Sequence, residues 1–367
     1  MKKTVIGKII DEGNKSRNTL SQVEMLENVK RSSQDLKQIQ LLENQIQALR
    51  NQITNTDNIR SNLIKEIQKL TGRKLITYFS INSFITDRDS KILEDYFISN
   101  KITSVDILLD SPGGFTDSAE KLIKICRMRT GNDLEFDFRT IVINRAKSAA
   151  TLFALGSSKV LLGSTAELGP VDPQIGLYAP NGEQVRDSAH QIYYGAKEYL
   201  DNTKRRFRWN KGGDQIMLSK YDPIVVKRSQ VAISHTADII AKRIYTNPYL
   251  ILGYDTDKDV RNDLKIFTEH EVSHSHGRPI YFEDISESGF VKNKFIQKLS
   301  DHYLNDEKIE EEKFDLLEKL LWELTIRSLE VVRPNSEPII QNNQIVGNRR
   351  VSKTLFESEN GLIITSD

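Results

Sequence analysis

Short apolar runs typical of strands alternate with helix-like stretches from residue 75 to residue 162, and this alternation constrains the fold more than any other feature. The strand-like runs are rich in β-branched and aromatic residues, and the stretches between them have apolar residues at helical spacing. Strands that alternate with helices form parallel βαβ units, in which helices cover the sheet. The sequence therefore predicts an α/β core whose ligands bind beyond the carboxyl ends of the strands. The four predicted strands are residues 75–81, 105–109, 136–143 and 159–162.

Two turns of this core contain residues suited to acyl-transfer chemistry. Residues 110–114 read Asp-Ser-Pro-Gly-Gly and follow the second predicted strand. A glycine pair at the end of a strand can direct backbone N–H groups at a developing oxyanion. Ser148 follows the third predicted strand and opens a short apolar helix, where the helix dipole favours negative charge. Together the two turns indicate acyl transfer, with peptide hydrolysis as the leading interpretation.

Charge and cysteine content narrow the function classes. The 367 residues have a formal net charge of +1, so general attraction to nucleic acid or to an anionic membrane is not indicated. The single cysteine, Cys126, excludes an intrachain disulfide framework, and its place on an apolar stripe predicts a buried small hydrophobe. There is no apolar run long enough to predict a membrane span, and residues 1–11 lack the features of a signal peptide. We therefore expect a cytoplasmic protein with neither a nucleic-acid nor a membrane partner.

The first 72 residues have a heptad pattern of apolar residues and lack the sequence pattern of a globular domain. From Ile39 to Leu70 the apolar residues step alternately by three and four, with Thr56 and Arg60 at two of the seam positions. Polar residues at such positions can fix the register of a coiled coil. So narrow a stripe favours a coiled coil that joins copies of the chain or binds a coiled-coil partner protein. The alternative is a single solvated helix.

The pattern loosens after the core. Residues 169–174 form a turn-rich loop, residues 185–209, 223–245 and 305–332 have helical spacing, and the tail from 333 is polar with short β-like runs. A basic cluster at residues 204–209 is interpreted as the solvated end of a helix and not as a nucleic-acid site. We predict three regions: an N-terminal helical coiled coil at 1–72, the core at 73–304, and a C-terminal helix with a polar tail at 305–367.

Four segments of the core resemble the serine dehydrogenase proteinase family, which belongs to the Clp-protease/crotonase fold group together with signal peptide peptidase A. The resemblance spans about residues 75–291 and excludes the heptads and the segment after about residue 304. It implies a Clp-protease/crotonase-like core of ββα units, a serine peptidase that needs no cofactor, a polypeptide substrate and assembly into homo-oligomers. The matching segments are residues 108–114, 148–152, 166–174 and 276–280, the last followed by Gly289.

The resemblance also assigns roles to site residues. Ser148 matches the nucleophile, and the backbone N–H groups of Gly114 (or Gly113) and of Ala149 match the oxyanion hole. The family usually has glycines after the serine, whereas this chain has Ala149 and Ala150. Alanine still supplies a backbone N–H, so the predicted oxyanion hole is retained.

The general base is left open among three residues. The position of the Clp-protease histidine falls near Pro170, so that histidine is absent. The lysine position of the signal peptide peptidases falls in a stretch that contains His190 and Lys197. His276 is the first choice, because it lies close to where the Clp proteases place their triad acid. His190 can equally be a surface residue, and Lys197 would need burial to lower its pKa.

Two further side-chain groups have simpler interpretations. His270, His274 and His276 have spacing that suits a metal, but no cysteine or carboxylate partner is evident, so no metal site is predicted. Asp172 is expected to brace its own loop and not to move protons.

Two other function classes stay open. In the first, the core has lost catalytic activity and serves as a scaffold that assembles through the coiled coil; the unassigned base and the two alanines after Ser148 favour this alternative. The crotonase-type fold also supports acyl-CoA chemistry, which would use the oxyanion hole without Ser148.

Overall fold

The computed structural model describes residues 58–81, 84–178, 184–204, 211–269, 275, 277–332, 335–341, 344–351, 353–359 and 361–366. The heptads before residue 58 and the candidate base His276 lie outside these residues. The chain divides into two compact units, one made of residues 1–79 with 309–367 and the other of residues 80–308. The three predicted regions, 1–72, 73–304 and 305–367, stay a prediction.

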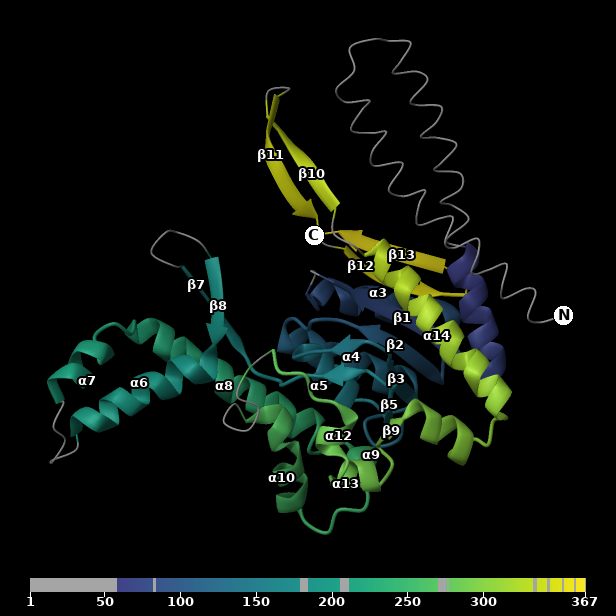
Figure 1. Cartoon of the computed structure of the whole chain (residues 1–367), viewed down its shortest axis with the longest axis horizontal. Coiled ribbons are helices and arrows are strands. Elements are labelled where there is room, and N and C mark those ends of the chain that lie inside the picture. The colour runs from purple at the N-terminus through teal and green to yellow at the C-terminus, as the bar shows by residue number, and fades with distance from the viewer. Residues whose placement is uncertain are drawn as a thin grey trace. The chain divides into compact units, whose positions relative to one another are not determined.

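Parallel strands form the centre of the unit at residues 80–308 (Figure 1). The strand order is β2-β3-β5-β9, and every neighbouring pair is parallel. All residues of β2 and β3 are buried, as expected for a parallel sheet that is covered on both faces. The predicted α/β core with a mainly parallel sheet is therefore confirmed. The strand bounds are β2 Val105–Asp110, β3 Phe138–Val142, β5 Lys159–Leu162 and β9 Ile296–Lys298.

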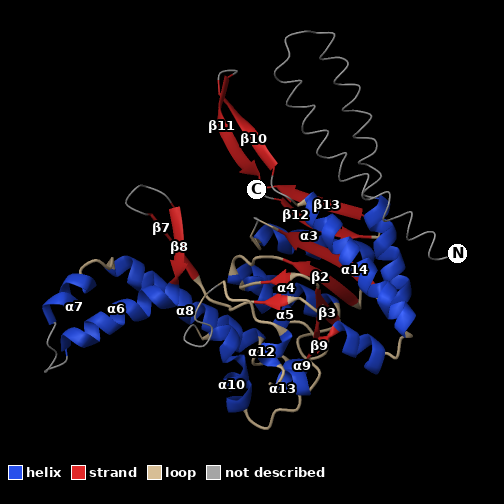
Figure 2. Cartoon of the chain, in the orientation of Figure 1, coloured by secondary structure: helices blue, strands red, loops and turns tan. Residues whose placement is uncertain are grey.

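Helices separate these strands along the chain (Figure 2). In α4 the stripe Ala119, Leu122, Ile123 and Cys126 is buried, so the prediction for Cys126 is confirmed and burial raises the pKa of its thiol. The helices of this unit are α3 Asp87–Asn100, α4 Thr116–Arg129, α5 Ala149–Leu155, α6 Ala189–Lys204, α7 Lys211–Leu218, α8 Pro223–Arg243, α9 Pro248–Ile251, α10 Asp257–Thr268, α12 Phe282–Ile285, α13 Gly289–Lys292 and the π-helix η1 Asp301–Asp306.

Two small sheets lie beyond the central strands. β4 (Arg145–Ala146) pairs in parallel with β6 (Glu167–Leu168), and β7 (Gln174–Tyr178) forms an antiparallel hairpin with β8 (Gln184–Ser188). Residues 185–188 were predicted to be helical, and this prediction is wrong. They pair with β7, and the helix begins only at Ala189, where the Ser188 hydroxyl accepts a hydrogen bond from the backbone N–H of Gln191 at 3.3 Å.

The other unit combines both ends of the chain. The strand order β13-β12-β1 joins residues near position 75 to residues near position 360. Its elements are a helix at residues 58–71, β1 Lys74–Ser80, α14 Glu311–Val331, the hairpin β10 Asn335–Gln341 with β11 Gln344–Val351, β12 Lys353–Ser358 and β13 Gly361–Ser366.

The helix at residues 58–71 buries the last part of the heptad stripe within the chain. Leu63 and Ile67 are each only 1% exposed. The guanidinium of Arg60, predicted to be a register-setting seam residue, is buried and donates to the carboxylate of Glu357 in β12 at 2.7 Å. These last turns therefore pack in their own unit, and the predicted coiled coil depends on the residues before 58. No helix in the described ranges is long and apolar enough to cross a membrane.

Candidate active site

Ser148 occupies a strained turn between β4 and α5. Its backbone has φ 52° and ψ −121°, a conformation that costs a residue with a side chain about 1–3 kcal/mol. Hydrogen bonds to the glycine loop hold the turn, because the N–H of Ser111 donates to the carbonyl of Arg145 at 3.2 Å and the N–H of Lys147 donates to the carbonyl of Ser111 at 3.0 Å. Such strain persists only where the surroundings impose it, and it is concentrated at functional sites.

The two glycines after β2 permit close approach to this turn. A Cβ on Gly113, which has φ +105°, would lie 2.6 Å from the carbonyl oxygen of Lys147 and 2.8 Å from the Cβ of Ser148. A Cβ on Gly114 would lie 2.2 Å from the backbone nitrogen of Ile85. Both positions therefore require glycine for a packing reason, and Gly113 lies directly against the serine.

Backbone hydrogen bonding decides which N–H groups can meet an oxyanion. The N–H of Gly113 donates to the hydroxyl of Ser111 at 3.1 Å, and that hydroxyl also accepts from the hydroxyl of Ser80 at 2.9 Å. Across the described ranges, no hydrogen bond uses the N–H of Gly114 or of Ala149. The structure therefore leaves Gly114 and Ala149 as the available donors, whereas Gly113 shapes the loop.

Lys147, to which the sequence reasoning gave no role, fastens the serine turn to the next loop. Its ammonium donates to the carbonyl of Leu168 at 3.1 Å and pairs with Glu167 at 3.0 Å. The carbonyl of Arg278 lies 3.4 Å away. Burial lowers the pKa of Lys147. Its position beside Ser148 was the signal available in the sequence.

The β7–β8 hairpin brings Asp172 and His190 together. Gln174 pairs with Ser188 at the base of the hairpin, so the residues just before the first strand meet those just after the second. His190 Nδ1 lies 2.6 Å from Asp172 Oδ1, and both side chains are largely buried, with 12% and 3% of their surface exposed. A carboxylate oxygen only accepts, so Nδ1 is the donor in this hydrogen bond. Asp172 therefore orients His190, a role that its predicted loop-bracing function missed.

The other predicted bases are placed differently. Lys197 lies on α6 two turns beyond His190, exposed, with its ammonium 6.0 Å from the ring centre of Tyr194. Within the described ranges, no hydrogen bond or ion pair joins Lys197 to the serine turn. His276 lies outside the described residues, and its neighbours Ser275 and Gly277 are exposed.

Ser148 lies at the wall of a cavity of about 410 Å³. Ser148, Gly114 and Asp172 line it together with residues of β7, β8 and α8. A smaller cavity of about 190 Å³, lined by His190 and Val171, shares Thr236 with the first. Asp172 thus lines the same cavity as Ser148, and its partner His190 lines the neighbouring one.

A buried carboxyl group lies beneath the glycine loop. Asp110 ends β2, is 1% exposed, and accepts a hydrogen bond from the side-chain amide of Asn144 at 2.6 Å. The guanidinium of Arg145 lies 3.5 Å away. Burial raises the pKa of Asp110 to about 6, against the opposing effect of Asn144 and Arg145. Since Asn144 and Arg145 lead into the serine turn, Asp110 links the two halves of the site.

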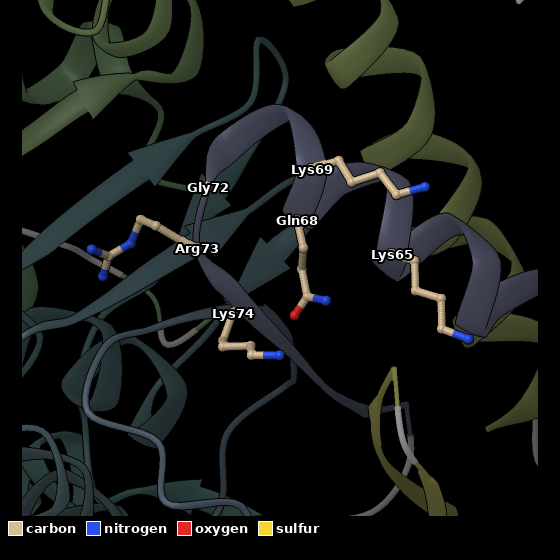
Figure 3. Close-up of a pocket in the computed structure, with 6 residues that line it drawn as sticks. All are labelled: Lys65, Gln68, Lys69, Gly72, Arg73 and Lys74. Atoms are coloured by element: carbon tan, nitrogen blue, oxygen red, sulfur yellow. The ribbon is translucent and has the colours of Figure 1, made fainter.

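A second pocket, in the unit formed by the chain ends, has a different character. It measures about 380 Å³ and lies at the end of the helix at residues 58–71, where cationic side chains surround Gln68 (Figure 3). Carbonyl groups at a helix C-terminus attract cations, which accounts for this composition. Among the described residues, no group of three or more histidine, cysteine, aspartate or glutamate side chains could hold a metal ion. The pocket is lined by Lys65, Gln68, Lys69, Gly72, Arg73 and Lys74.

Parts of this chain are similar to known proteins. Residues 32–189 match the family model of the ClpP-like SDH-type serine proteinases. Two uncharacterised proteins of Methanocaldococcus jannaschii are 32% identical over 199 residues and 29% identical over 133 residues. These matches cover 52% and 32% of this chain, and 66% and 43% of the relatives. The chain therefore spans less than two thirds of the length of these relatives.

Two solved structures of a membrane-bound stomatin-specific protease also overlap the chain. A serine-to-alanine variant matches with a TM-score of 0.24 and 19% identity, over 34% of this chain and 61% of that one. A lysine-to-alanine variant in complex with a substrate peptide matches with a TM-score of 0.23 and 20% identity, over 33% and 57%.

Proposed function

We propose that the chain is a serine peptidase that hydrolyses polypeptides with Ser148 as its nucleophile, since residues 32–189 match the family model of the ClpP-like SDH-type serine proteinases. The main supporting observation is the strained Ser148 turn, which lies against Gly113 and has two backbone N–H groups without a partner in the described ranges, those of Gly114 and Ala149. This is the arrangement that acyl transfer requires: a presented hydroxyl and two fixed donors for the oxyanion.

We propose His190 as the general base. Nε2 takes the proton from the Ser148 hydroxyl as Oγ bonds to the scissile carbonyl carbon, and the carbonyl oxygen becomes an oxyanion that accepts from Gly114 and Ala149. The protonated His190 then gives its proton to the departing amine, which leaves an acyl-enzyme ester. Water, deprotonated by His190, hydrolyses that ester. Asp172 holds Nδ1 and stabilises the imidazolium that forms.

The choice of His190 depends on three observations. It has a carboxylate partner at 2.6 Å, it is largely buried, and that partner lines the same cavity as Ser148. Lys197 is exposed and does not line the cavity that contains Ser148. His276 remains the alternative base.

A fluorophosphonate probe followed by intact mass tests the nucleophile. We expect one adduct on the wild type and none on Ser148→Ala. His190→Gln should slow labelling by roughly 10²–10⁴, the usual contribution of a general base. Lys197→Met is the matched control and should label at the wild-type rate. A His276→Gln variant that abolishes labelling while His190→Gln leaves it unchanged would transfer the role of base to His276.

The second candidate is an inactive scaffold. One observation favours it: the Ser148 hydroxyl makes no hydrogen bond with any residue that the structure describes. A folded, oligomeric sample without an adduct would support this candidate. Retention on a coenzyme A resin, with no effect of Ser148→Ala, would instead support acyl-CoA chemistry.

Assembly is a separate part of the proposal. We propose a cytoplasmic homo-oligomer in which the heptads before residue 58 join copies of the chain or recruit a coiled-coil protein. Light scattering on the full chain measures its mass. Leu49→Glu places a charge in the seam and should lower that mass, whereas the adjacent Arg50→Glu, outside the seam, should not.

A further inference from the structure

One cationic side chain lines the cavity that contains Ser148. Arg186 lies on β8, opposite Gly176 of β7, and both residues line the cavity. The guanidinium carbon of Arg186 is 4.1 Å from the ring centre of Phe84, another lining residue. Stacking on an aromatic face fixes the plane of a guanidinium and leaves its N–H groups free to donate at the edge. Arg186 is therefore a positioned cation at the candidate active site.

The charge of Arg186 has no carboxylate partner in the described ranges. The carboxylate that lines the cavity, Asp172, is hydrogen bonded to His190. The other titratable group of the wall, His235, contacts the carboxylate of Asp117. Side chains alternate along a strand, so Asp187 points to the opposite face of the hairpin from Arg186. Arg186 thus adds a positive charge, with no ion pair to a described residue, to the cavity that Ser148 and the Asp172 carboxylate also line.

Apolar surface lies next to this cation. Phe84 is 37% exposed and Phe115 is 62% exposed, and both line the same cavity. An aliphatic stem with a carboxylate at its end would cover the aromatic rings and reach the guanidinium. A carboxylate matches the edge of a guanidinium through two parallel hydrogen bonds, which neutral amides or cations cannot reproduce.

We infer that Arg186 is a specificity-determining residue that selects polypeptides with a carboxylate close to the scissile bond. This inference depends on the proposed peptidase function, because it names the substrate class of that same cavity. The carboxylate is supplied either by a glutamate or aspartate side chain or by a free peptide C-terminus. Both sources present the same group to Arg186.

Binding to the full-length Ser148→Ala protein tests the inference without catalysis. Fluorescent peptides that differ only in glutamate, glutamine or lysine at one position, each with a free or an amidated C-terminus, are compared by anisotropy. We expect a carboxylate to tighten binding by roughly 10- to 100-fold over the amide, the range for a charge-assisted hydrogen bond. Dependence on the side chain or on the terminus identifies the source.

Second-site variants then locate the preference. Adding Arg186→Gln to Ser148→Ala should remove the preference for the carboxylate peptide, and adding Arg186→Glu should make the lysine peptide bind more tightly. Arg228→Gln, on an exposed arginine of α8, is the matched control and should keep it. A carboxylate preference that survives Arg186→Gln, or peptides that bind without any preference or do not bind, overturns the inference. Fluorophosphonate labelling is measured on a parallel set of Arg186 and Arg228 variants that retain Ser148, so failure of the peptidase proposal is detected separately from failure of the specificity inference.

Discussion

Replacing Gly113 by alanine should slow the reaction of Ser148 by ~10²- to 10³-fold while the chain still folds. The new Cβ would lie 2.6 Å from the Lys147 carbonyl oxygen and 2.8 Å from the Ser148 Cβ, whereas ordinary contact begins at 3.4 Å. The loop and the serine turn must therefore separate by about 0.8 Å at the first contact, since 3.4 minus 2.6 is 0.8. A displacement of about 1 Å at a reacting group can reduce the rate by ~10²-fold, and loss of one oxyanion donor reduces it by ~10²–10³.

Gly72→Ala is the matched control for backbone strain. Gly72 also has positive φ, +69°, but nothing lies within 4 Å of a Cβ built there. An alanine in such a conformation costs about 1–2 kcal/mol, so both variants should lose at least this much stability. The control should keep full activity because its substitution displaces nothing.

The assay combines the labelling rate of Ser148 by a fluorophosphonate with thermal unfolding of the same samples. We expect Gly113→Ala to label ~10²- to 10³-fold more slowly while still unfolding cooperatively. A wild-type labelling rate in Gly113→Ala would refute the reasoning, because it would show that the glycine loop does not set the position of the serine turn.

Three further predictions concern stability, each measured by urea unfolding. Burial raises the pKa of Asp110 from 3.8 to about 6, so between these pH values the folded state binds the proton more tightly than the unfolded state. The unfolding free energy should therefore fall by roughly 3 kcal/mol as the pH rises from about 4 to 6. In Asp110→Asn this decrease should be absent. Burial, with Arg139 nearby, lowers the pKa of His302 from 6.5 to about 4, so between these pH values the unfolded state binds the proton more tightly. The unfolding free energy should therefore rise by roughly 3 kcal/mol from pH 4 to 6.5, and His302→Gln should flatten this rise. An unchanged slope in His302→Gln would contradict the assignment to His302. Glu357→Gln removes the carboxylate that accepts from the buried Arg60 guanidinium and should cost about 3–5 kcal/mol, whereas the double variant Arg60→Met with Glu357→Gln should recover part of this loss.

The parts of the core that depend on local sequence were predictable. The strand at Val105–Asp110 and the helix from Ala149 have apolar spacing and turn residues that specify them without reference to the rest of the chain. The glycine pair was predictable for the same reason, because it follows a strand directly. Which of the two glycines has an available N–H could not be predicted, because this depends on the Ser111 hydroxyl, which accepts from the N–H of Gly113.

The pairing of Asp172 with His190 could not be predicted from the sequence, because hairpin register places them together. β7 and β8 have five residues each and β8 is mostly polar, so helical spacing was preferred over residues 185–188 and the hairpin was missed. Without the hairpin, a loop aspartate and a helix histidine 18 positions later have no reason to meet. Arg60 was misjudged for a related reason: its partner, Glu357, is 297 residues away.

The strained backbone of Ser148 also sets the evolutionary balance between stability and activity. Glycine adopts positive φ freely, so Ser148→Gly should be more stable than the wild type, whereas Ser148→Ala keeps the strain. A lineage that no longer needed the hydroxyl would gain stability by a single substitution at this codon. Under the proposed function, the need for the Ser148 hydroxyl is the reason for a strained residue at this position, and the glycine variant is the form suited to long storage, crystallisation and substrate trapping.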